Sequence, residues 1–223
     1  MNYLYKDLET FSYNSLDYGV YKYAEHAEVL LYPFACNDEA PDIWDCTKDP
    51  KPYRLQQLQR VKNLPWVAHN SQFDRVVMEK CFGITHYPWI DTMVIAYQHG
   101  LPGSLKALCN LYKLSDDVAK QERGQYRINL FTKPLGKNRK LKRATRLTHP
   151  QEWEEFKEYA IHDILSMREI FKRLPKWNCT KYEYKVWQLD QKINERGMKI
   201  DIEMVDCALT AIKKAIKENN ENY

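Results

Sequence analysis

The sequence predicts an α/β domain with helices around a mixed β-sheet, followed by a helical extension. Short apolar runs dominate the first part of the chain, and later runs alternate with segments whose apolar residues recur at helical spacing. After Pro175 only amphipathic helical patterns remain. We therefore expect one domain over residues 1–175 and a helical extension over residues 176–223.

The predicted strands are short runs of apolar and aromatic residues. Pro33 lies inside the second run. Because proline cannot donate a hydrogen bond to a neighbouring strand, we expect that run to form an edge strand or to end early. The five predicted strands cover residues 2–8, 29–35, 42–45, 66–68 and 89–90.

The predicted helices have one apolar face and recognisable ends. Gly83 closes one of them, Asp91 caps the next, and Pro150 suits the first turn of a long one. Residues 115–147 are expected to be an irregular, polar excursion. The helices are predicted at residues 53–62, 73–82, 93–98, 104–112 and 150–173.

The extension contains two predicted helices, over residues 180–196 and from Asp201 to about Lys217. The last helix has an apolar face that no later segment covers. We expect either that the chain is the front part of a longer protein or that it dimerises through this face. The alternative is that the helix packs against the first domain.

Composition narrows the class of protein. A hydrophobic content of 44% with only 7 glycines disfavours disorder, and no apolar run reaches the length of a membrane span. We expect no signal peptide, because a strand is predicted almost from residue 1. The six scattered cysteines form no CxxC pair. They predict reduced, mostly buried thiols of a cytoplasmic protein rather than a zinc site or a disulfide framework.

Positive charge is concentrated in one segment. The net charge is +4, yet seven basic and no acidic residues lie between Lys133 and Arg146. Without these seven, the 34 basic residues fall to 27, against 30 acidic ones. The segment favours binding to a polyanion. A solvated loop without a partner is the alternative.

Four carboxylates and a tyrosine form the candidate catalytic set: Asp7, Glu9, Asp74, Tyr159 and Asp163. Alternate strand residues share a face, so residues 7 and 9 lie together, and residues 159 and 163 share a helix face. Clustered carboxylates repel one another unless cations separate them, and hard oxygen ligands favour Mg²⁺ or Mn²⁺. Two such ions can promote phosphodiester hydrolysis, with the tyrosine orienting water.

These segments resemble the three exonuclease motifs of the DnaQ-like family, in the branch with a tyrosine in the third motif. The resemblance extends to the proofreading domain of phage-type family A DNA polymerases and covers about residues 3–205. It implies an RNase H-like fold with a mixed five-stranded sheet, and release of 5′-mononucleotides from a 3′ end. The similar segments begin at Asp7-Leu8-Glu9-Thr10, Gly19-Val20-Tyr21, Ala68-His69-Asn70, Asp91-Thr92-Met93, Leu101-Pro102-Gly103 and Asn194-Glu195-Arg196.

The resemblance implies a role for each motif residue. The four motif carboxylates would hold two divalent cations, and Tyr159 would orient the attacking water. These carboxylates are Asp7, Glu9, Asp74 and Asp163. Thr10 and Asn70 would contact the terminal nucleotide. Glu158 stands where the other branch has a histidine, and we expect His162 to be a packing or surface residue. The extension resembles the junction to a polymerase domain, which does not follow, so we expect no DNA synthesis by this chain.

The expected substrate is a single-stranded or frayed DNA 3′ end. Phe11, Tyr13 and Phe73 lie near the motifs and are candidates for stacking on bases, although Phe73 is as readily a core residue. Basic residues would guide the strand: Lys137, Arg139, Lys140, Lys142 and Arg143.

Two alternatives use the same residues differently. The same fold can degrade RNA 3′ ends, or the chain can be a non-catalytic nucleic-acid-binding or assembly module. A polymerase domain or subunit is a further possible partner, and the sequence leaves the oligomeric state open.

Overall fold

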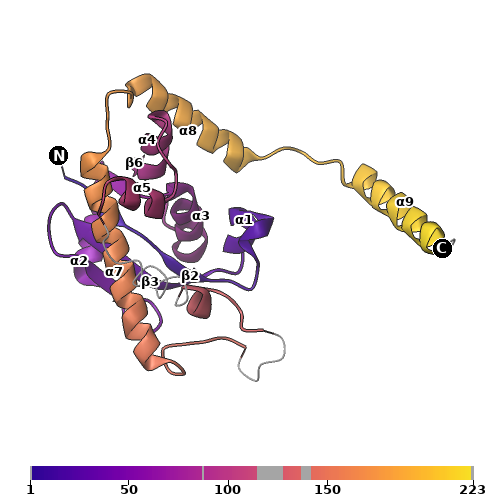
Figure 1. Cartoon of the computed structure of the whole chain (residues 1–223), viewed down its shortest axis with the longest axis horizontal. Helices are drawn as coiled ribbons and strands as arrows, with labels where there is room; N and C mark the ends of the chain where they lie inside the picture. The colour runs from indigo at the N-terminus through magenta and orange to yellow at the C-terminus, as the bar shows by residue number, and fades with distance from the viewer. Residues whose placement is uncertain (1, 87, 115–127, 137–141, 222–223) are drawn as a thin grey trace. The chain divides into compact units, whose positions relative to one another are not determined.

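The computed structural model describes all residues except 1, 87, 115–127, 137–141 and 222–223. The chain divides into two compact units, Met1–Cys179 and Thr180–Tyr223. The first unit is a sheet with helices on both faces, and the second consists of helices α8 (Lys181–Arg196) and α9 (Ile202–Glu221) (Figure 1). Lys137, Arg139 and Lys140 lie outside the described residues.

The sheet is mixed, as predicted. Leu31 of the long strand β3 pairs with Glu9 on one side and Asp45 on the other, so β3 has neighbours on both sides. β1 and β2 follow each other along one side of β3, both antiparallel to it, while β1 pairs with β5 and β5 with β6 in parallel. Six strands thus fill five positions across the sheet. They are β1 (Leu4–Lys6), β2 (Glu9–Phe11), β3 (Glu28–Cys36), β4 (Asp42–Asp45), β5 (Trp66–Ala68) and β6 (Trp89–Asp91).

The prediction for Pro33 was wrong, because β3 neither ends at this residue nor lies at an edge. The Asp7 amide donates to the Pro33 carbonyl at 3.2 Å. Proline has no N–H to return that bond, so the ladder is incomplete opposite Asp7. This gap coincides with the break between β1 and β2 and leaves β3 continuous.

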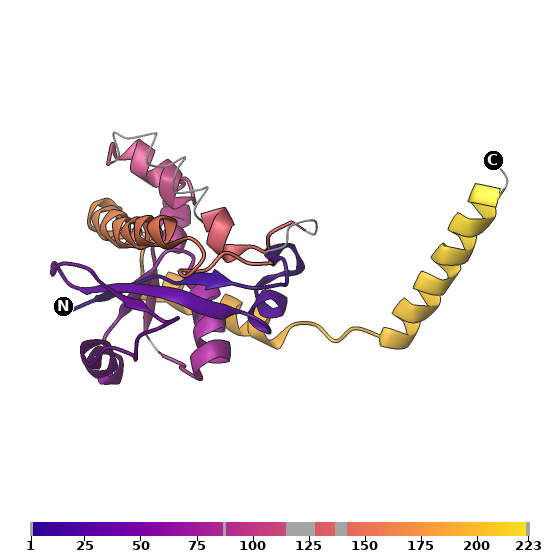
Figure 2. The same cartoon turned by 90° about the horizontal axis from the view of Figure 1, so that it is seen from below.

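The two faces of the sheet carry different helices. Tyr5 packs with Ala96, Leu108 and Ile164 on one face, which α4, α5 and α7 cover. On the other face, Tyr32 contacts α3 and α2, and Figure 2 shows α2 and α7 on opposite sides of the sheet. The helices of this unit include η1 (Leu16–Tyr18), α1 (Val20–Ala24), α2 (Tyr53–Arg60), α3 (Ser71–Phe82), α4 (Thr92–Gln98), α5 (Leu105–Leu111) and α7 (Pro150–Arg173).

The structure corrects two further expectations. The short helices η1 and α1 were not predicted. Residues 128–132 are helical, and Leu130, Phe131 and Ala144 are buried against Trp153 of α7, so this part of residues 115–147 is not a polar excursion. Phe131 makes an edge contact with the Trp153 ring at a centroid distance of 4.9 Å. The apolar residues there complete the core over α7.

The structure also bears on the cysteines, on membrane crossing and on the exposed apolar residues of the second unit. All six cysteines are free thiols, but only Cys109 is buried, so the expectation of mostly buried thiols was wrong. Within the described part of the chain, no helix has the length and apolar character needed to cross a membrane. In the second unit the apolar faces are exposed at Leu189, Ile193, Leu209 and Ile212, among other positions.

A buried hydrogen bond fixes α7 to the sheet. The indole Nε1 of Trp153 donates to Asp45 Oδ2 at 2.9 Å, and Thr47 donates twice to the other carboxylate oxygen. Both Asp45 and Trp153 are buried. The bond therefore joins the N-terminal part of α7 to β4.

We predict that Trp153→Phe lowers the free energy of unfolding by about 1–3 kcal/mol, because the Asp45 carboxylate loses a buried donor. Urea unfolding monitored by circular dichroism measures the change. Trp177→Phe is the matched control, since Trp177 is exposed and should change stability by less than about 0.5 kcal/mol. Equal effects of the two substitutions would contradict the prediction.

Candidate metal centre

The extended backbone that runs from β1 into β2 brings Asp7 and Glu9 to one face of the sheet. Side chains alternate along a strand, so these two residues share the face that carries Tyr5 and is covered by α7. Leu8, between them, is buried. The centre therefore begins with two carboxylates that the backbone geometry alone places together.

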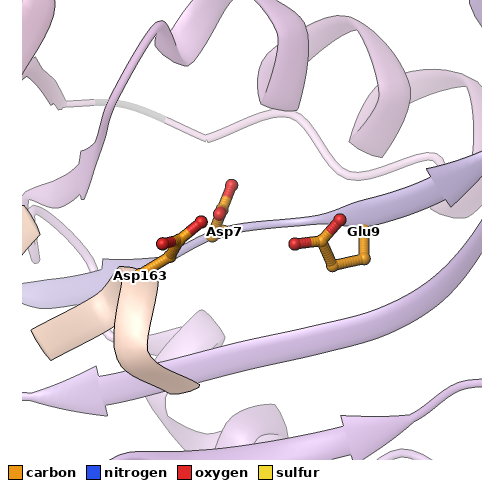
Figure 3. Close-up of side chains that lie close together, drawn as sticks. All are labelled: Asp7, Glu9 and Asp163. Carbon is orange, nitrogen blue, oxygen red and sulfur yellow. The ribbon is translucent and has the colours of Figure 1, made fainter. Parts of the chain in front are cut away.

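Helix α7 supplies the third carboxylate. Trp153, Phe156, Ala160 and Ile164 form its buried stripe, which fixes the rotation of the helix against the sheet. Asp163 lies beside this stripe, and its carboxylate, with those of Asp7 and Glu9, forms a group whose ligand atoms are all within 4.8 Å of one another (Figure 3). His162 is exposed, as expected for a surface residue.

The electrostatics of this group favour a bound cation. Burial, and then the charge of Asp163, raise the pKa of Asp7 to about 6. Burial also raises the pKa of Asp163 to about 6, and burial followed by the charges of Asp7 and Asp163 raises that of Glu9. A divalent cation would offset this repulsion, and an all-oxygen donor set fits Mg²⁺ or Mn²⁺.

Tyr159 lies one helical turn before Asp163, and the two side chains interact electrostatically. Burial, and then the charge of Asp163, raises the pKa of the Tyr159 phenol. The phenol therefore stays protonated near neutral pH and acts as a hydrogen-bond donor.

Asp74 is not part of the three-carboxylate group. It lies in the first turn of α3, on the opposite face of the sheet, and its Oδ1 accepts a 2.8 Å hydrogen bond from Lys6 Nζ. The pKa of Asp74 is raised to about 7, because the effects of burial and of the Asp7 charge outweigh the Lys6 charge, which lowers it. The charge of Asp74 also raises the pKa of Glu9, so the fourth acid lies within electrostatic reach of the other three. Lys6 stands in no motif of the sequence that would have indicated this contact.

The loop before α3 is held by Asp91. One oxygen of this buried carboxylate accepts from the Asn70 amide, and the other accepts from the amide and hydroxyl of Ser71. Asp91 also caps α4, as predicted, through Met93. Asn70 is exposed in a left-handed conformation, with φ 60° and ψ 52°. The sequence indicated that Asp91 caps α4. It did not indicate that the same carboxylate also fixes the start of α3.

Thr10 and Phe73 meet at Tyr23, which the sequence analysis also missed. The Thr10 hydroxyl and the Tyr23 phenol are 2.7 Å apart, and the Tyr23 and Phe73 rings pack at a centroid distance of 5.6 Å. Thr10 is buried and Phe73 is half-buried. Helix α1, which carries Tyr23, thus bridges the first and second motifs.

The expected nucleic-acid contacts differ in exposure. Phe11 is buried in the core with Leu31 and Phe131, so its ring is not available for stacking on a base. Tyr13 is 66% exposed and makes an edge contact with Phe11. Arg143 lies over the Phe11 ring and pairs with Glu28 at 2.5 Å.

Lys142 is exposed next to Arg143. Tyr13 and Arg143 both contact the Phe11 ring of β2, and Lys142 precedes Arg143 in the chain.

We predict that, without metal, Asp7→Asn becomes more stable relative to the parent protein as pH rises from about 5 to 7.5. The raised pKa of Asp7 means that its protonated form stabilises the fold at low pH, and that this stabilisation is lost as pH rises through about 6. The asparagine does not ionise. Asp7 is half-buried, so we expect a relative gain of about 1–2 kcal/mol.

Urea unfolding in EDTA at the two pH values measures this gain. Asp42→Asn, at an exposed carboxylate on β4, is the control and should show no such trend. A pH-independent difference between Asp7→Asn and the parent would contradict the electrostatic explanation.

The chain is similar to several known proteins. A DNA polymerase of Bacillus phage SP02 is 34% identical over 212 residues, which cover 91% of this chain. The chain spans about a third of that relative, 32% of its length. Brucella melitensis NrnC bound to pGG has a TM-score of 0.52 at 18% identity, covering 85% of this chain and 79% of NrnC. Escherichia coli RNase D has a TM-score of 0.48 at 17% identity, covering 85% of this chain and 45% of RNase D.

The sheet order and the likeness to NrnC identify the fold as RNase H-like. A model of the 3′–5′ exonuclease family found in DNA polymerases of family A matches residues 1–177. The motif residues Asp7, Glu9, Asp74, Tyr159 and Asp163 all lie within the matched region. The chain therefore belongs to the 3′–5′ exonuclease family.

Proposed function

We propose that the first unit is a metal-dependent exonuclease that removes 5′-mononucleotides from single-stranded or frayed DNA 3′ ends. The observation that carries this proposal is the group formed by Asp7, Glu9 and Asp163, with its ligand atoms within 4.8 Å of one another and Tyr159 one helical turn from Asp163. A pure binding module would not need clustered acids that repel phosphate.

The chain's own residues would divide the work. Asp7, Glu9 and Asp163 would hold one divalent cation, and Asp7 with Asp74 would hold a second. Such cations supply positive charge that activates water and stabilises the leaving oxygen in phosphodiester hydrolysis. Tyr159, which stays protonated, would orient the attacking water by hydrogen bonding, while a group of lower pKa accepts the proton.

The similarity to a phage DNA polymerase favours DNA as the substrate. The proposed role is proofreading, with residues 176–223 as the junction to a polymerase domain on the same or another chain. The exposed apolar positions of α8 and α9 are compatible with such a junction. We expect no polymerase activity from this chain.

The strand would be held beside β2. Tyr13 offers an exposed ring, and Lys142 with Arg143 supplies positive charge to the phosphates. The exposed Asn70 would contact the terminal nucleotide from the α3 side, whereas the Thr10 side chain is buried and hydrogen-bonded to Tyr23. The half-buried Phe73 would limit the space available to the last base.

A second candidate is degradation of RNA 3′ ends at the same centre. NrnC, which shares the fold, is described as bound to pGG. The carboxylate group does not distinguish the two sugars, so the choice depends on contacts to the 2′ position.

We predict that the protein shortens a 5′-labelled DNA with a 3′ overhang one nucleotide at a time in Mg²⁺ or Mn²⁺, and that EDTA stops the reaction. Asp7→Ala should lower the rate by more than about 1000-fold, because a metal ligand contributes several kcal/mol to catalysis. Tyr159→Phe should lower it by about 100-fold or more through loss of water positioning. A gel ladder measured over time gives the rates.

The same assay separates the alternatives. A matched RNA strand degraded at least as fast as the DNA would favour the RNA candidate. Binding of DNA without any degradation would favour the non-catalytic module. Asp42→Ala is the control, and it should degrade DNA at the parental rate because Asp42 is exposed on β4.

We predict that Tyr13→Ala weakens binding of single-stranded DNA by about 5- to 100-fold, since stacking on an aromatic ring contributes about 1–3 kcal/mol per base. Fluorescence anisotropy with a labelled oligonucleotide in Ca²⁺, which should support binding but little cleavage, measures the affinity. Tyr53→Ala is the matched control because Tyr53, on α2, is 75% exposed. If both variants lose affinity equally, Tyr13 does not contact the strand.

A further inference from the structure

Lys6 is a buried ammonium group that the proposed reaction does not use. It precedes Asp7 in the chain, so its side chain leaves the opposite face of the sheet, where it meets Asp74 of α3. We propose that Lys6 is a positioning residue that holds the Asp74 carboxylate in place and competes with a second divalent cation for it. This inference rests on the proposed function.

The surroundings of Lys6 fix its position. Its side chain is fully buried, and Nζ lies 2.8 Å from Asp74 Oδ1 and 3.1 Å from Met78 Sδ. The same atom lies 5.3 Å from the centre of the Tyr32 ring and 5.0 Å from that of Trp89. Aromatic faces attract a cation but cannot neutralise it. Asp74 is therefore the carboxylate that compensates Lys6 among the contacts described here.

The ion pair has a consequence for cation binding. The three-carboxylate group carries its negative charges on the α7 side, whereas the charge of Asp74 is already balanced by Lys6. A divalent cation that binds between Asp7 and Asp74 must approach a fixed ammonium of the same sign. Lys6 would therefore weaken that second site and leave the three-carboxylate site largely unaffected.

Calorimetric titration of the full chain with Mn²⁺, without nucleic acid, tests this inference. The parent should bind one ion more tightly than a second. Lys6→Met has a similar length and no charge, and it should tighten the second site by about tenfold or more while changing the first by less than about threefold. A second-site affinity that is unchanged or weaker in Lys6→Met would overturn the proposal.

Lys51→Met is the matched control. Lys51 is a partly buried lysine that, like Lys6, lies near aromatic rings, here those of Trp44 and Phe82. Its side chain donates to Gln59 rather than to a carboxylate of the centre. Both Mn²⁺ affinities should stay at the parental values in this variant. Tightening in both lysine variants would show a general effect of net charge and would also overturn the proposal.

A stability cycle covers the case in which Lys6→Met folds poorly, because that variant leaves a buried carboxylate unpaired. The thermal midpoints of Lys6→Met, Asp74→Asn and the double variant are compared in EDTA. The double variant should be more stable than Lys6→Met, and the effects of the two substitutions should not add. Additive losses would show that the two side chains do not interact, which overturns the inference.

The titration also separates this inference from the proposed function. A parent protein that binds no divalent cation would overturn both. A parent that binds cations and shortens DNA, together with a Lys6→Met variant whose second site is unchanged, would overturn only the role of Lys6.

Discussion

The repulsion among buried carboxylates is the constraint on which the first unit depends. The charge of Asp163 raises the pKa of Asp7, and the charges of Asp7 and Asp163 raise that of Glu9, so the metal-free fold must hold the three carboxylates together against their charges. Covalent spacing along a strand supplies the first pair. Helix α7 supplies the third, and its buried stripe opposes the repulsion through hydrophobic packing rather than through any bond within the site.

Helix α7 is held to the sheet by hydrogen bonds both before and after Asp163 in the sequence. Before Asp163, Trp153 donates to Asp45 of β4. After it, Arg168 donates to the carbonyls of Asn37 and Glu39, in the loop between β3 and β4. These contacts join α7 to the edge of the sheet formed by β4. The position of Asp163 relative to β1 therefore depends on how α7 packs across the sheet. Preorganisation of this kind is what a metal site requires from its frame.

The sequence predicted those features that depend on local periodicity. The pairing of residues 7 with 9 and of 159 with 163 follows from the repeats of a strand and a helix, and both pairs lie as expected. Tertiary features were missed. Lys6 is a charged residue that is ordinarily placed in solvent, and Phe131 belongs to a polar stretch that becomes core only where Trp153 and Phe156 cover it. Pro33 remains inside β3 because its missing donor faces a break in β1–β2.

The alternation of side chains on β1 also explains why the fourth acid differs from the other three. Asp7 faces α7, but Lys6 faces α3, so Asp74 can reach the centre only from the side where a lysine is buried. An acid on that face without Lys6 would add a fourth uncompensated charge to the repulsion. With Lys6, the acid is present, neutralised and held at the first turn of a helix, where the helix dipole also favours a negative charge. Residues 6–9 thus place two of the proposed ligands on one face of the sheet and the counter-charge for Asp74 on the other.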